Sequence, residues 1–549
     1  MINRLVSPFL KPRLNAIARY DRHAEALQAR TLSVLLHKAA HTQFGRDFGF
    51  EAIETSIRQS AGGIRQADLE NWHTLYRQHV PVLPYNDLKP YMDRMRQGEP
   101  DVLWPGLVRR FSKSSGTTSD KSKFIPVSKE ALHGCHYKGG IDMFALYLHN
   151  YPNSKILSGK NLAMGGSLHP SGHPKITEGD VSAIIMKNLP FWAQIKRAPS
   201  LKIALMDEWE SKMAAMAEAV MPAHITQIAG VPSWTMVLLQ RILELSGKSC
   251  IAEVWPDLEV FFHGGVSFTP YREQFINLLG FPDFHFVETY NASEGFFAIQ
   301  DRPLKATEEQ DMLLMLDYGI FYEFVPVEDV AEDGLSLKPD ARCLHIGQVE
   351  TGRQYALLIT TNAGLWRYMI GDTVVFTSLH PARIQVSGRT KHFINAFGEE
   401  VIVDNADHAL QYACKETGAE ISEYTAGPVF LDNRASACHQ WLIEFKREPR
   451  DMALFTHCLD RQLQAVNSDY EAKRHRDILL KQPLVTAVPE GTFYAWLKRN
   501  DKLGGQHKVP RLANRRDYLD AILAMTAEST GAERSPNTGK TSDGRTTEP

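Results

Sequence analysis

Residues 225–246, ITQIAGVPSWTMVLLQRILELS, place a short apolar run directly before a helical pattern of apolar residues. The same order returns in LEVFFHGG at 258–265, which precedes a helical stretch at 271–279, and the next apolar run is HFVETYNASEG at 285–295. Apolar runs that alternate with helical stretches are typical of α/β architecture, in which loops at the strand ends carry function. We therefore predict an α/β fold for the region from 141 to 400.

The sequence changes in character after about residue 390. HQWLIEF at 439–445 and TFYAWL at 492–497 have the aromatic and β-branched content of strands, and they flank a charged helical stretch at 451–480. This order predicts a small βαβ-type domain of about 130 residues.

Composition narrows the class of protein. A chain of 549 residues predicts two to four domains, at about 100–200 residues each. With 43% hydrophobic residues and a net charge of -3, it is neither a disordered chain nor a collagen-like fibre, and we expect no nucleic-acid partner. Residues 441–516 hold 15 Lys/Arg against 9 Asp/Glu, a local net of +6. That balance fits a solvated face, and it leaves open an anionic substrate facing this domain.

The cysteines and the two ends of the chain indicate its compartment and its ordered extent. Six scattered cysteines without a CxxC pair favour reduced thiols, and hence a cytoplasmic location. The N-terminus has no apolar core of a secretory signal, and no run of eighteen apolar residues occurs, so we expect no membrane partner. Residues 528–549 contain no aliphatic or aromatic residue beyond alanine and are predicted to be a disordered tail. We expect a monomer.

The most informative string is FSKSSGTTSDKSKFIPVS at 111–128. Small hydroxyl residues around a glycine let backbone N–H groups converge on an anion, and nearby lysines add positive charge. A Walker loop is excluded, because it would need glycine where Ser115 and Asp120 stand. A phosphate loop of another type and a Ser/Thr-rich surface turn remain open. The candidate phosphate-binding residues are Ser114, Ser115, Gly116, Thr117, Thr118 and Lys121.

SSGTTSDKSKFIP at 114–126 resembles the phosphate loop of the adenylate-forming superfamily, which includes acyl-CoA synthetases, peptide-synthetase adenylation domains and luciferases. More narrowly, it is similar to the auxin-responsive Gretchen Hagen family of acyl-acid-amido synthetases, although Asp120 replaces the usual glycine. HTQFGRDFGF at 41–50, VPVLPYNDLKPYMDRMRQGEPDVLWPG at 80–106 and AGVPSWTMVLLQ at 229–240 also resemble that family. The resemblance covers most of residues 25–515, and the chain looks like a non-plant member.

HFVETYNASEG at 285–295 is a second segment that resembles the family. From the residues alone, Tyr290 is an exposed-looking aromatic that could cover a purine, and Glu294 is a carboxylate that could hold Mg²⁺. A core tyrosine and a helix-capping Ser293 are the alternatives. The resemblance implies that Tyr290, Asn291 and Ser293 line the adenine pocket and that Glu294 contacts metal and phosphate. It also implies that Gly265 and Val266, in HGGVS, lie beside the adenine and acyl groups.

Three further motifs complete the resemblance. From the residues alone, LWRYMIGDTV at 365–374 allows either an aspartate that accepts ribose hydroxyls or a common Gly-Asp turn. The segment resembles a family motif whose aspartate binds ribose, which implies that role for Asp372. GRTKHF at 388–393, with Arg389, resembles the interdomain hinge, and GGQHKVPR at 504–511 resembles the loop that carries the adenylation lysine, here Lys508. The implied organisation is a domain over 1–387 that binds ATP and the acyl acid, with α/β subdomains and a β-barrel-like part. A mobile α+β lid over 388–527 follows it.

Chemically, these parts suit adenylation. A carboxylate is a poor electrophile. Its attack on the α-phosphorus of ATP breaks the bond to the β-phosphate, expels pyrophosphate and gives an acyl-adenylate, while Mg²⁺, lysines and loop N–H groups stabilise the charge. An amine, which we expect to be an amino acid, then displaces AMP to give an amide. The alternatives are an acyl-CoA ligase with the same first step and a nucleotide-binding protein without turnover.

Overall fold

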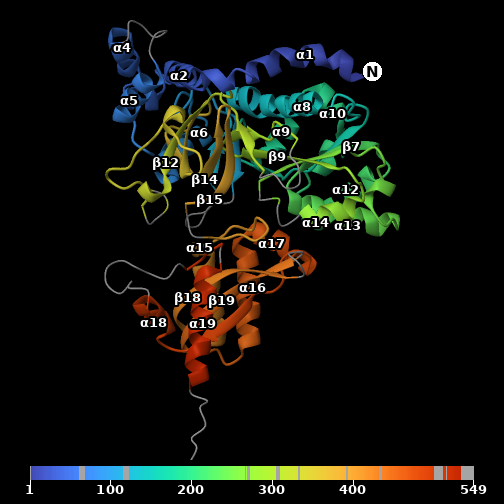
Figure 1. The fold of residues 1–549 in the computed structure, drawn as a ribbon, viewed down its shortest axis with the longest axis vertical. Helices are drawn as coiled ribbons and strands as arrows, with labels where there is room; N and C mark the ends of the chain where they lie inside the picture. Colours follow the sequence, from blue (N-terminus) through green and yellow to red (C-terminus); the bar gives the residue numbers. More distant parts are fainter. Residues whose placement is uncertain are drawn as a thin grey trace, which may run out of the picture. The chain divides into compact units, whose positions relative to one another are not determined.

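The computed structural model describes residues 2–60, 68–114, 123–265, 268, 272–303, 310–331, 334, 336–390, 393–431, 436–499, 511–514 and 516–532. The chain divides into two compact units, residues 1–391 and 392–549. The boundary expected after residue 387 falls inside the last strand of the first unit, β15 (Ala382–Arg389). Figure 1 shows the elements of both units in chain order.

The first unit is organised around one eleven-stranded sheet with the order β12-β13-β14-β15-β11-β10-β9-β8-β7-β3-β6. Strands β6 to β9 run parallel, whereas the rest of the sheet is antiparallel. The antiparallel half contains the region that the resemblance implied to be barrel-like, and its strands are continuous with the parallel half in one sheet. The bounds are β3 Lys160–Ala163, β6 Arg197–Ala198, β7 Ile225–Gly230, β8 Val260–Gly264, β9 His285–Ala292, β10 Gly295–Ile299, β11 Met312–Leu314, β12 Ile320–Pro326, β13 Gln354–Thr361 and β14 Tyr368–Leu379.

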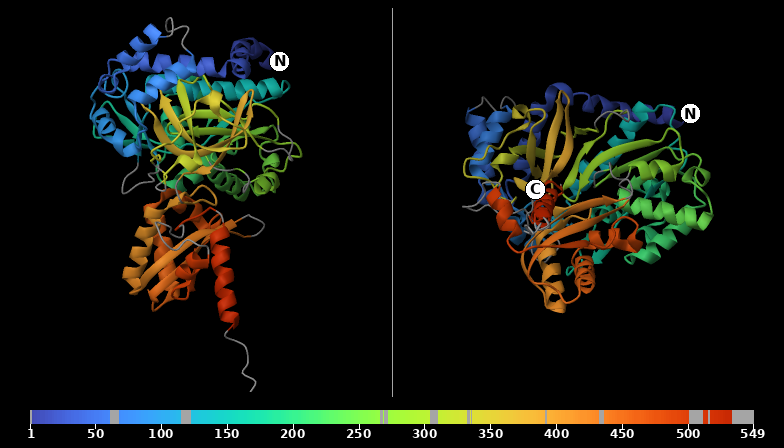
Figure 2. Two further views of the ribbon diagram at one scale, coloured as in Figure 1. Left: turned by 60° about the vertical axis from the view of Figure 1, so that its left-hand side comes forward. Right: turned by 60° about the horizontal axis from the view of Figure 1, so that its bottom comes forward.

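Helices cover both faces of the parallel strands, as the alternation along β8 requires. Phe261 stacks on Phe275 of α14 (Arg272–Leu279), and its neighbour Phe262 packs on Tyr147 of α8 (Lys138–Asn150). Successive side chains of a strand point to opposite faces, so α8 and α14 lie on opposite sides of the sheet (Figure 2). The strand–helix order predicted at 225–246 is confirmed by β7 followed by α13 (Pro232–Ser246).

A second, four-stranded sheet holds the candidate phosphate hairpin. Its order is β2-β1-β5-β4, and β1 pairs antiparallel with β2. The bounds are β1 Arg110–Ser114, β2 Lys123–Pro126, β4 Leu168–Pro170 and β5 Thr177–Gly179. The other helices of this unit are α1 Ile2–Ile17, α2 Tyr20–Ala39, α3 Gln43–Asp47, α4 Phe50–Ser60, α5 Leu69–His79, α6 Tyr85–Arg96, α7 Lys129–Ala131, the π-helix η1 Leu132–Tyr137, α9 Val181–Lys187, α10 Phe191–Ile195, α11 Leu201–Ala204 and α12 Trp209–Val220; the 3₁₀-helices are η2 Ile251–Glu253, η4 Val327–Asp329 and η5 Ile346–Gln348.

The second unit has a three-stranded sheet, β18-β19-β20, with helices on both faces. Leu442 of β19 packs against α18 and α19, whereas Phe445, on the other face, packs on Phe455 of α16. Because β19 and β20 are parallel and are joined through α16 and α17, the predicted βαβ unit is present. The bounds are β16 Phe393–Ile394, β17 Val401–Ile402, α15 Val403–Thr417, β18 Glu420–Leu431, β19 Ser436–Arg447, α16 Met452–Val466, α17 Ser468–Arg474, η7 His475–Asp477, β20 Leu484–Val488, α18 Thr492–Arg499 and α19 Asp517–Ala532.

Two expectations for this unit were wrong. TFYAWL is not a strand but the first part of α18, and the third strand of the sheet is β20. The spacing explains this, because Phe493 and Trp496 are both buried while Tyr494 is exposed, which matches one face of a helix rather than alternation. The tail was expected to be disordered from residue 528, yet the backbone stays helical to Ala532 in α19. A helix anchored by buried Leu519 and Ile522 extends readily, since each further residue adds one hydrogen bond.

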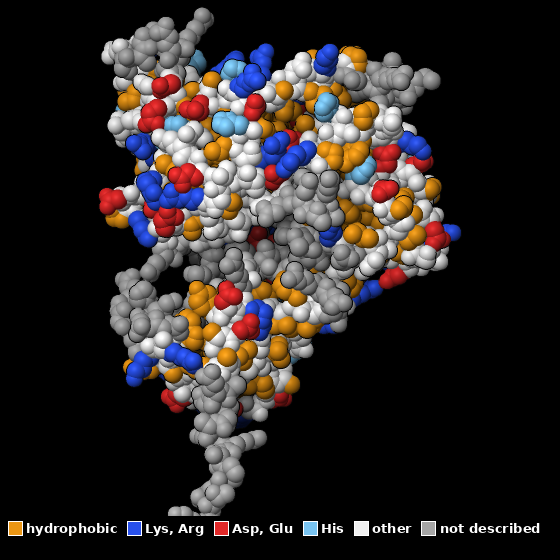
Figure 3. All heavy atoms as spheres, in the orientation of Figure 1, with side chains coloured by type: hydrophobic (Ala, Val, Ile, Leu, Met, Phe, Trp, Pro, Cys, Tyr) orange, Lys and Arg blue, Asp and Glu red, His pale blue; other side chains and the backbone are white. Residues whose placement is uncertain are grey.

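The surface of the described chain carries both charge signs. On the face drawn in Figure 3, Lys and Arg side chains of the first unit are interspersed with Asp and Glu side chains. No helix within the described ranges combines the length and the apolar content that crossing a bilayer requires. All six cysteines are free thiols, and four of them are buried.

Candidate active site

The site lies where several strand ends of the first unit meet, and the structure describes it in part. Tyr290, Asn291, Ser293, Glu294, Asp372, Arg389 and Gly265 are described, as is the backbone of Ser114 at the end of β1. The other predicted site residues, Ser115, Gly116, Thr117, Thr118, Lys121, Val266 and Lys508, lie outside the described residues.

Tyr290, Asp372 and Arg389 form one hydrogen-bonded cluster. The Tyr290 hydroxyl donates to Asp372 Oδ2, and Arg389 Nε lies 2.9 Å from Asp372 Oδ1. The expectation that Tyr290 is exposed was wrong, because its side chain is only 8% exposed and its ring packs on Phe297. Burial and the nearby Asp372 raise the pKa of Tyr290 well above its usual value, so the phenol stays protonated and donates. The cluster joins β9 to the β14–β15 hairpin.

A bulge in β14 directs Asp372 into this cluster. Leu358 of β13 pairs with Met369, and Ala356, two residues earlier, pairs with Thr373, so β14 holds two more residues than β13 over this interval. Within that interval Gly371 has φ +94, a backbone conformation that favours glycine. Bulges of this kind re-aim a side chain. The Gly-Asp pair of the sequence is therefore part of a strand irregularity rather than a free turn.

The turn between β9 and β10 brings in Ser293 and Glu294. Ser112 Oγ of β1 donates to Ser293 Oγ at 2.9 Å, which ties the phosphate hairpin to this turn. Burial raises the pKa of Glu294, the positive charges of Lys123 and Arg389 oppose that shift, and the negative charge of Asp372 adds to it. Glu294 therefore lies within electrostatic range of the Asp372 cluster and of the hairpin.

Lys123, the first residue of β2, is one of the two lysines of the phosphate-loop string at 114–126, but it was not among the candidate site residues predicted from the sequence. Its side chain is 8% exposed, and its Nζ donates to the Tyr368 hydroxyl at 3.3 Å. The same ammonium lies 5.5 Å from the ring centroid of Tyr85 and 5.9 Å from that of Tyr368, both within cation–π range. Lys121 and Lys123 stand two apart in one string, and only folding shows that Lys123 is buried beside Tyr368.

The family of the chain is decided by comparison with known proteins. The GH3 family N-terminal domain matches residues 13–282, the GH3 family central domain matches 313–389, and the GH3 family C-terminal domain matches 404–517. Together these matches cover most of the chain. The protein belongs to the GH3 family. This confirms the resemblance seen in the sequence motifs.

Relatives of this GH3 protein are distant in sequence but similar in length. It is 21% identical to the indole-3-acetic acid-amido synthetase GH3.4 of Arabidopsis thaliana, over 91% of each chain. It is 23% identical to GH3.8 of Oryza sativa subsp. indica, an enzyme of the same name, over 91% of this chain and 90% of the relative. Among solved structures, AtGH3.15 acyl acid amido synthetase in complex with 2,4-DB matches with a TM-score of 0.58 at 16% identity, over 94% of this chain and 96% of the other. A 2-hydroxyisobutyryl-CoA ligase in complex with 2-HIB-AMP and CoA matches with a TM-score of 0.52 at 12% identity, over 92% and 94%.

The donor set of the GH3 site fits a magnesium ion in part. Mg²⁺ is usually held by one or two carboxylates together with substrate phosphates and water. Burial raises the pKa of the Glu294 carboxylate, a desolvation that a bound cation would offset, and the positive charge of Lys123 acts on the same group. Glu294 is therefore the residue that would hold the ion, with the remaining ligands coming from the nucleotide.

The histidines around the GH3 site belong to its supporting core. His136, in the π-helix η1, contacts the side chain of Asn291, and burial lowers its pKa to about 4. His263, before Gly264 and Gly265, stacks on Phe268 with ring centroids 4.0 Å apart, and burial lowers its pKa to about 3. Both imidazoles are neutral at physiological pH, which agrees with a structural role for each.

The raised pKa of Glu294 predicts a pH effect that depends on magnesium. Only the ionised carboxylate binds a cation, so protons and Mg²⁺ compete for Glu294. We expect the acidic limb of the pH profile for pyrophosphate release to move to lower pH as the Mg²⁺ concentration rises. In Glu294→Gln the residual activity should show no such movement, and an identical movement in that variant would contradict the assignment.

Proposed function

We propose that this GH3 protein adenylates a small carboxylic acid with ATP and then transfers the acyl group to an amino acid, forming an amide. The observation that carries the proposal is the cluster of Tyr290, Asp372 and Arg389 beside Glu294 and Lys123, in a chain of this family. The cluster offers the Asp372 carboxylate for ribose hydroxyls. Lys123 offers positive charge for a triphosphate, and Glu294 offers negative charge for its cation. The names of the amido synthetases among its relatives support the same activity.

The first half-reaction joins two anions, so the site must offset their repulsion. Asp372 would accept the ribose hydroxyls while Tyr290 and Arg389 hold its carboxylate in place. Lys123 and the residues of the 115–122 segment would neutralise charge that builds on the phosphate oxygens. A Mg²⁺ ion held by Glu294 would supply Lewis-acid stabilisation of the pyrophosphate leaving group.

In the second half-reaction the amine must reach the acyl carbon of the adenylate, so a charged group that contacts the phosphate during adenylation has to move away. We propose that Lys508 belongs to the first step only and that movement at residues 388–393 exchanges it between the steps. Lys508→Ala should then lower pyrophosphate release by about 10²-fold or more, with little change in the transfer of a preformed acyl-adenylate to the amine. The two rates are separable by single-turnover measurement, and equal losses in both would contradict this role.

Two assays test the proposed activity itself. Pyrophosphate release across a panel of small carboxylic acids should identify at least one acid that supports turnover. With that acid, mass spectrometry should find an amide when amino acids are supplied and no thioester when CoA is supplied. A thioester would favour the CoA-ligase alternative, and no pyrophosphate with any acid would contradict both enzymes.

A further inference from the structure

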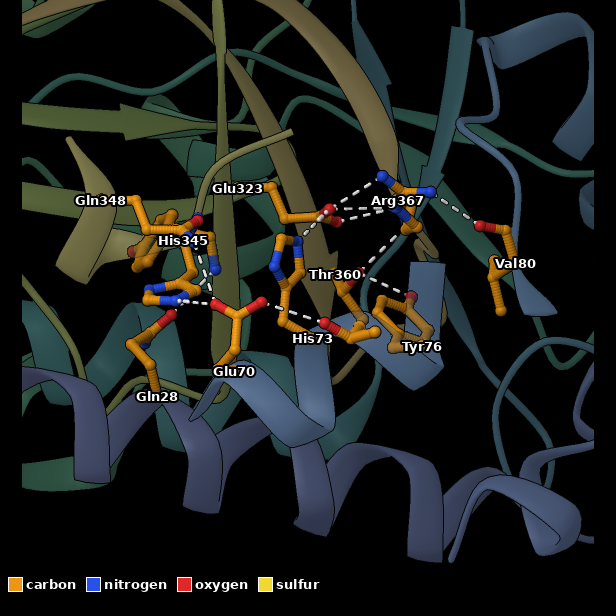
Figure 4. Close-up of polar contacts among 12 residues, drawn as sticks. Gln28, Glu70, His73, Tyr76, Val80, Glu323, His345, Gln348, Thr360 and Arg367 are labelled. Carbon is orange, nitrogen blue, oxygen red and sulfur yellow. Dashed lines mark hydrogen bonds and ion pairs between the residues drawn. The ribbon is translucent and has the colours of Figure 1, made fainter. Parts of the chain in front are cut away.

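A buried ion pair involves Arg367, five positions before Asp372 in the chain, and its role is not explained by the contacts of the candidate site described above. Arg367 binds Glu323 of β12 through two nitrogens, with Nη2 to Oε1 at 2.8 Å and Nε to Oε2 at 2.9 Å. Its third nitrogen, Nη1, donates to the Val80 carbonyl at 2.8 Å, and His73 Nε2 of α5 lies 3.0 Å from Glu323 Oε1. Figure 4 shows these side chains converging from helix and sheet. All three ionisable side chains are at most 5% exposed.

Arg367 holds an uncommon backbone conformation at the point where β14 begins. Its φ is +41, although it is not a glycine. Such a conformation is unfavourable for a residue with a side chain and persists only where the surroundings hold it. Here the Arg367 N–H donates to Thr360 Oγ1 at 3.0 Å, and its carbonyl accepts from Leu83 N–H at 3.0 Å. The residue is therefore fixed by its side chain and by both backbone groups.

The position of Arg367 sets the geometry of the first residues of β14. The next residue, Tyr368, accepts the hydrogen bond from Lys123. After Met369 comes the bulge that presents Asp372 to Tyr290 and Arg389. Because a bulge leaves its own residues without regular ladder pairing, its geometry depends on the anchors at its two ends. Arg367 fixes one end, and the pairing of β14 with β15 fixes the other.

We propose that Arg367, held by Glu323, is a positioning residue for the nucleotide: it sets the start of β14 so that Asp372 meets the ribose hydroxyls and Tyr368 orients Lys123. The inference rests on the proposed adenylation and adds residues that touch neither ATP nor the acid. Burial alone would raise the pKa of Glu323, but the charge of Arg367 and the hydrogen bond from His73 lower it to about 2. The pair is therefore ionised at physiological pH, which suits an anchor rather than a proton carrier.

The test compares ATP with 2′-deoxyATP, because the missing hydroxyl removes one contact of Asp372. Dissociation constants for both nucleotides are measured by calorimetry on the full chain. The wild type should bind ATP more tightly than 2′-deoxyATP. Arg367→Lys keeps the charge next to Glu323 but loses the planar fork. It should weaken ATP binding by about tenfold or more and bring the ratio of the two constants close to one.

A second variant and a matched control separate positioning from a general loss of stability. Glu323→Asp keeps the charge and should reduce the ratio in the same direction. Arg474 makes a comparable two-nitrogen pair with Asp460 in the other unit, with side chains 9% and 7% exposed, so Arg474→Lys should leave the ratio unchanged. An unchanged ratio in both Arg367→Lys and Glu323→Asp, or an equal loss in Arg474→Lys, would overturn the inference. Equal binding of ATP and 2′-deoxyATP by the wild type would overturn it while leaving adenylation to the pyrophosphate assay, whereas no ATP binding at all would contradict the proposed function too.

Discussion

Lys123→Ala should lower the rate of pyrophosphate release by about 10²–10³-fold, which is the usual effect of removing one preorganised charge-stabilising donor. The lysine is already buried beside Tyr85 and Tyr368, so its ammonium needs no reorganisation when charge develops on the phosphates. Its removal also takes away a positive charge that opposes the raised pKa of Glu294. The effect should appear in the rate with saturating ATP, measured by a coupled pyrophosphate assay.

Lys129→Ala is the matched control for this prediction. Lys129 is an exposed lysine six positions further along the chain, at the start of α7, and its loss should leave the rate within about twofold, as surface changes usually do. Tyr368→Phe removes only the hydroxyl that accepts the Lys123 hydrogen bond and should give an intermediate loss. If Lys123→Ala releases pyrophosphate as fast as the wild type, the lysine is a structural residue of the hairpin.

Arg367→Met should lower the free energy of unfolding of the first unit by about 3–5 kcal/mol, the usual effect of leaving one partner of a buried ion pair alone. Glu323 would then be a carboxylate at 1% exposure whose remaining side-chain partner is His73. Urea denaturation followed by circular dichroism measures the change. The double variant Arg367→Met with Glu323→Leu should recover part of the loss, because apolar residues of similar volume replace such pairs well.

The exposed pair of Arg241 and Glu244 provides the comparison. Their side chains are 40% and 57% exposed, so Arg241→Met should change stability by about 0–1 kcal/mol.

The pH dependence of the free energy of unfolding provides a second check on the buried pair. Glu323 has a folded pKa of about 2, against an ordinary value of 4.5. It therefore stabilises the fold above pH 4.5, and this contribution is lost as the pH falls from 4.5 toward 2. A loss in Arg367→Met as small as that in Arg241→Met would contradict the anchoring role of the buried pair.

The sequence predicted the parts of the fold that have local signals. Apolar runs at 225–230 and 258–264 became parallel strands, each followed by its helix, because periodicity and turn residues act over a few positions. TFYAWL was predicted wrongly, since its composition favours a strand while its i,i+3 spacing favours a helix, and packing of Phe493 and Trp496 decided between them. The continuation of α19 past residue 527 likewise depends on anchoring rather than on composition.

The candidate site was predictable as a set of motifs but not as a geometry. Tyr290, Asp372 and Arg389 were each singled out, yet the contact between Tyr290 and Asp372 links positions 82 apart in the chain. No local pattern gives the burial of Lys123 or the meeting of Arg367 with Glu323, because both arise when β2, β12 and β14 pack together. These long-range contacts determine the electrostatics of the site, and only the folded structure shows them.

Isotope transfer tests the central claim most directly. An acid that supports turnover is labelled with ¹⁸O in its carboxylate and incubated with ATP, Mg²⁺ and the amine. If the carboxylate attacks the α-phosphorus, the AMP released must keep one carboxylate oxygen, so mass spectrometry should find one ¹⁸O atom in AMP and none in pyrophosphate. AMP without ¹⁸O, in a reaction that still consumes ATP and the acid, would contradict an acyl-adenylate and with it the proposed function of this site.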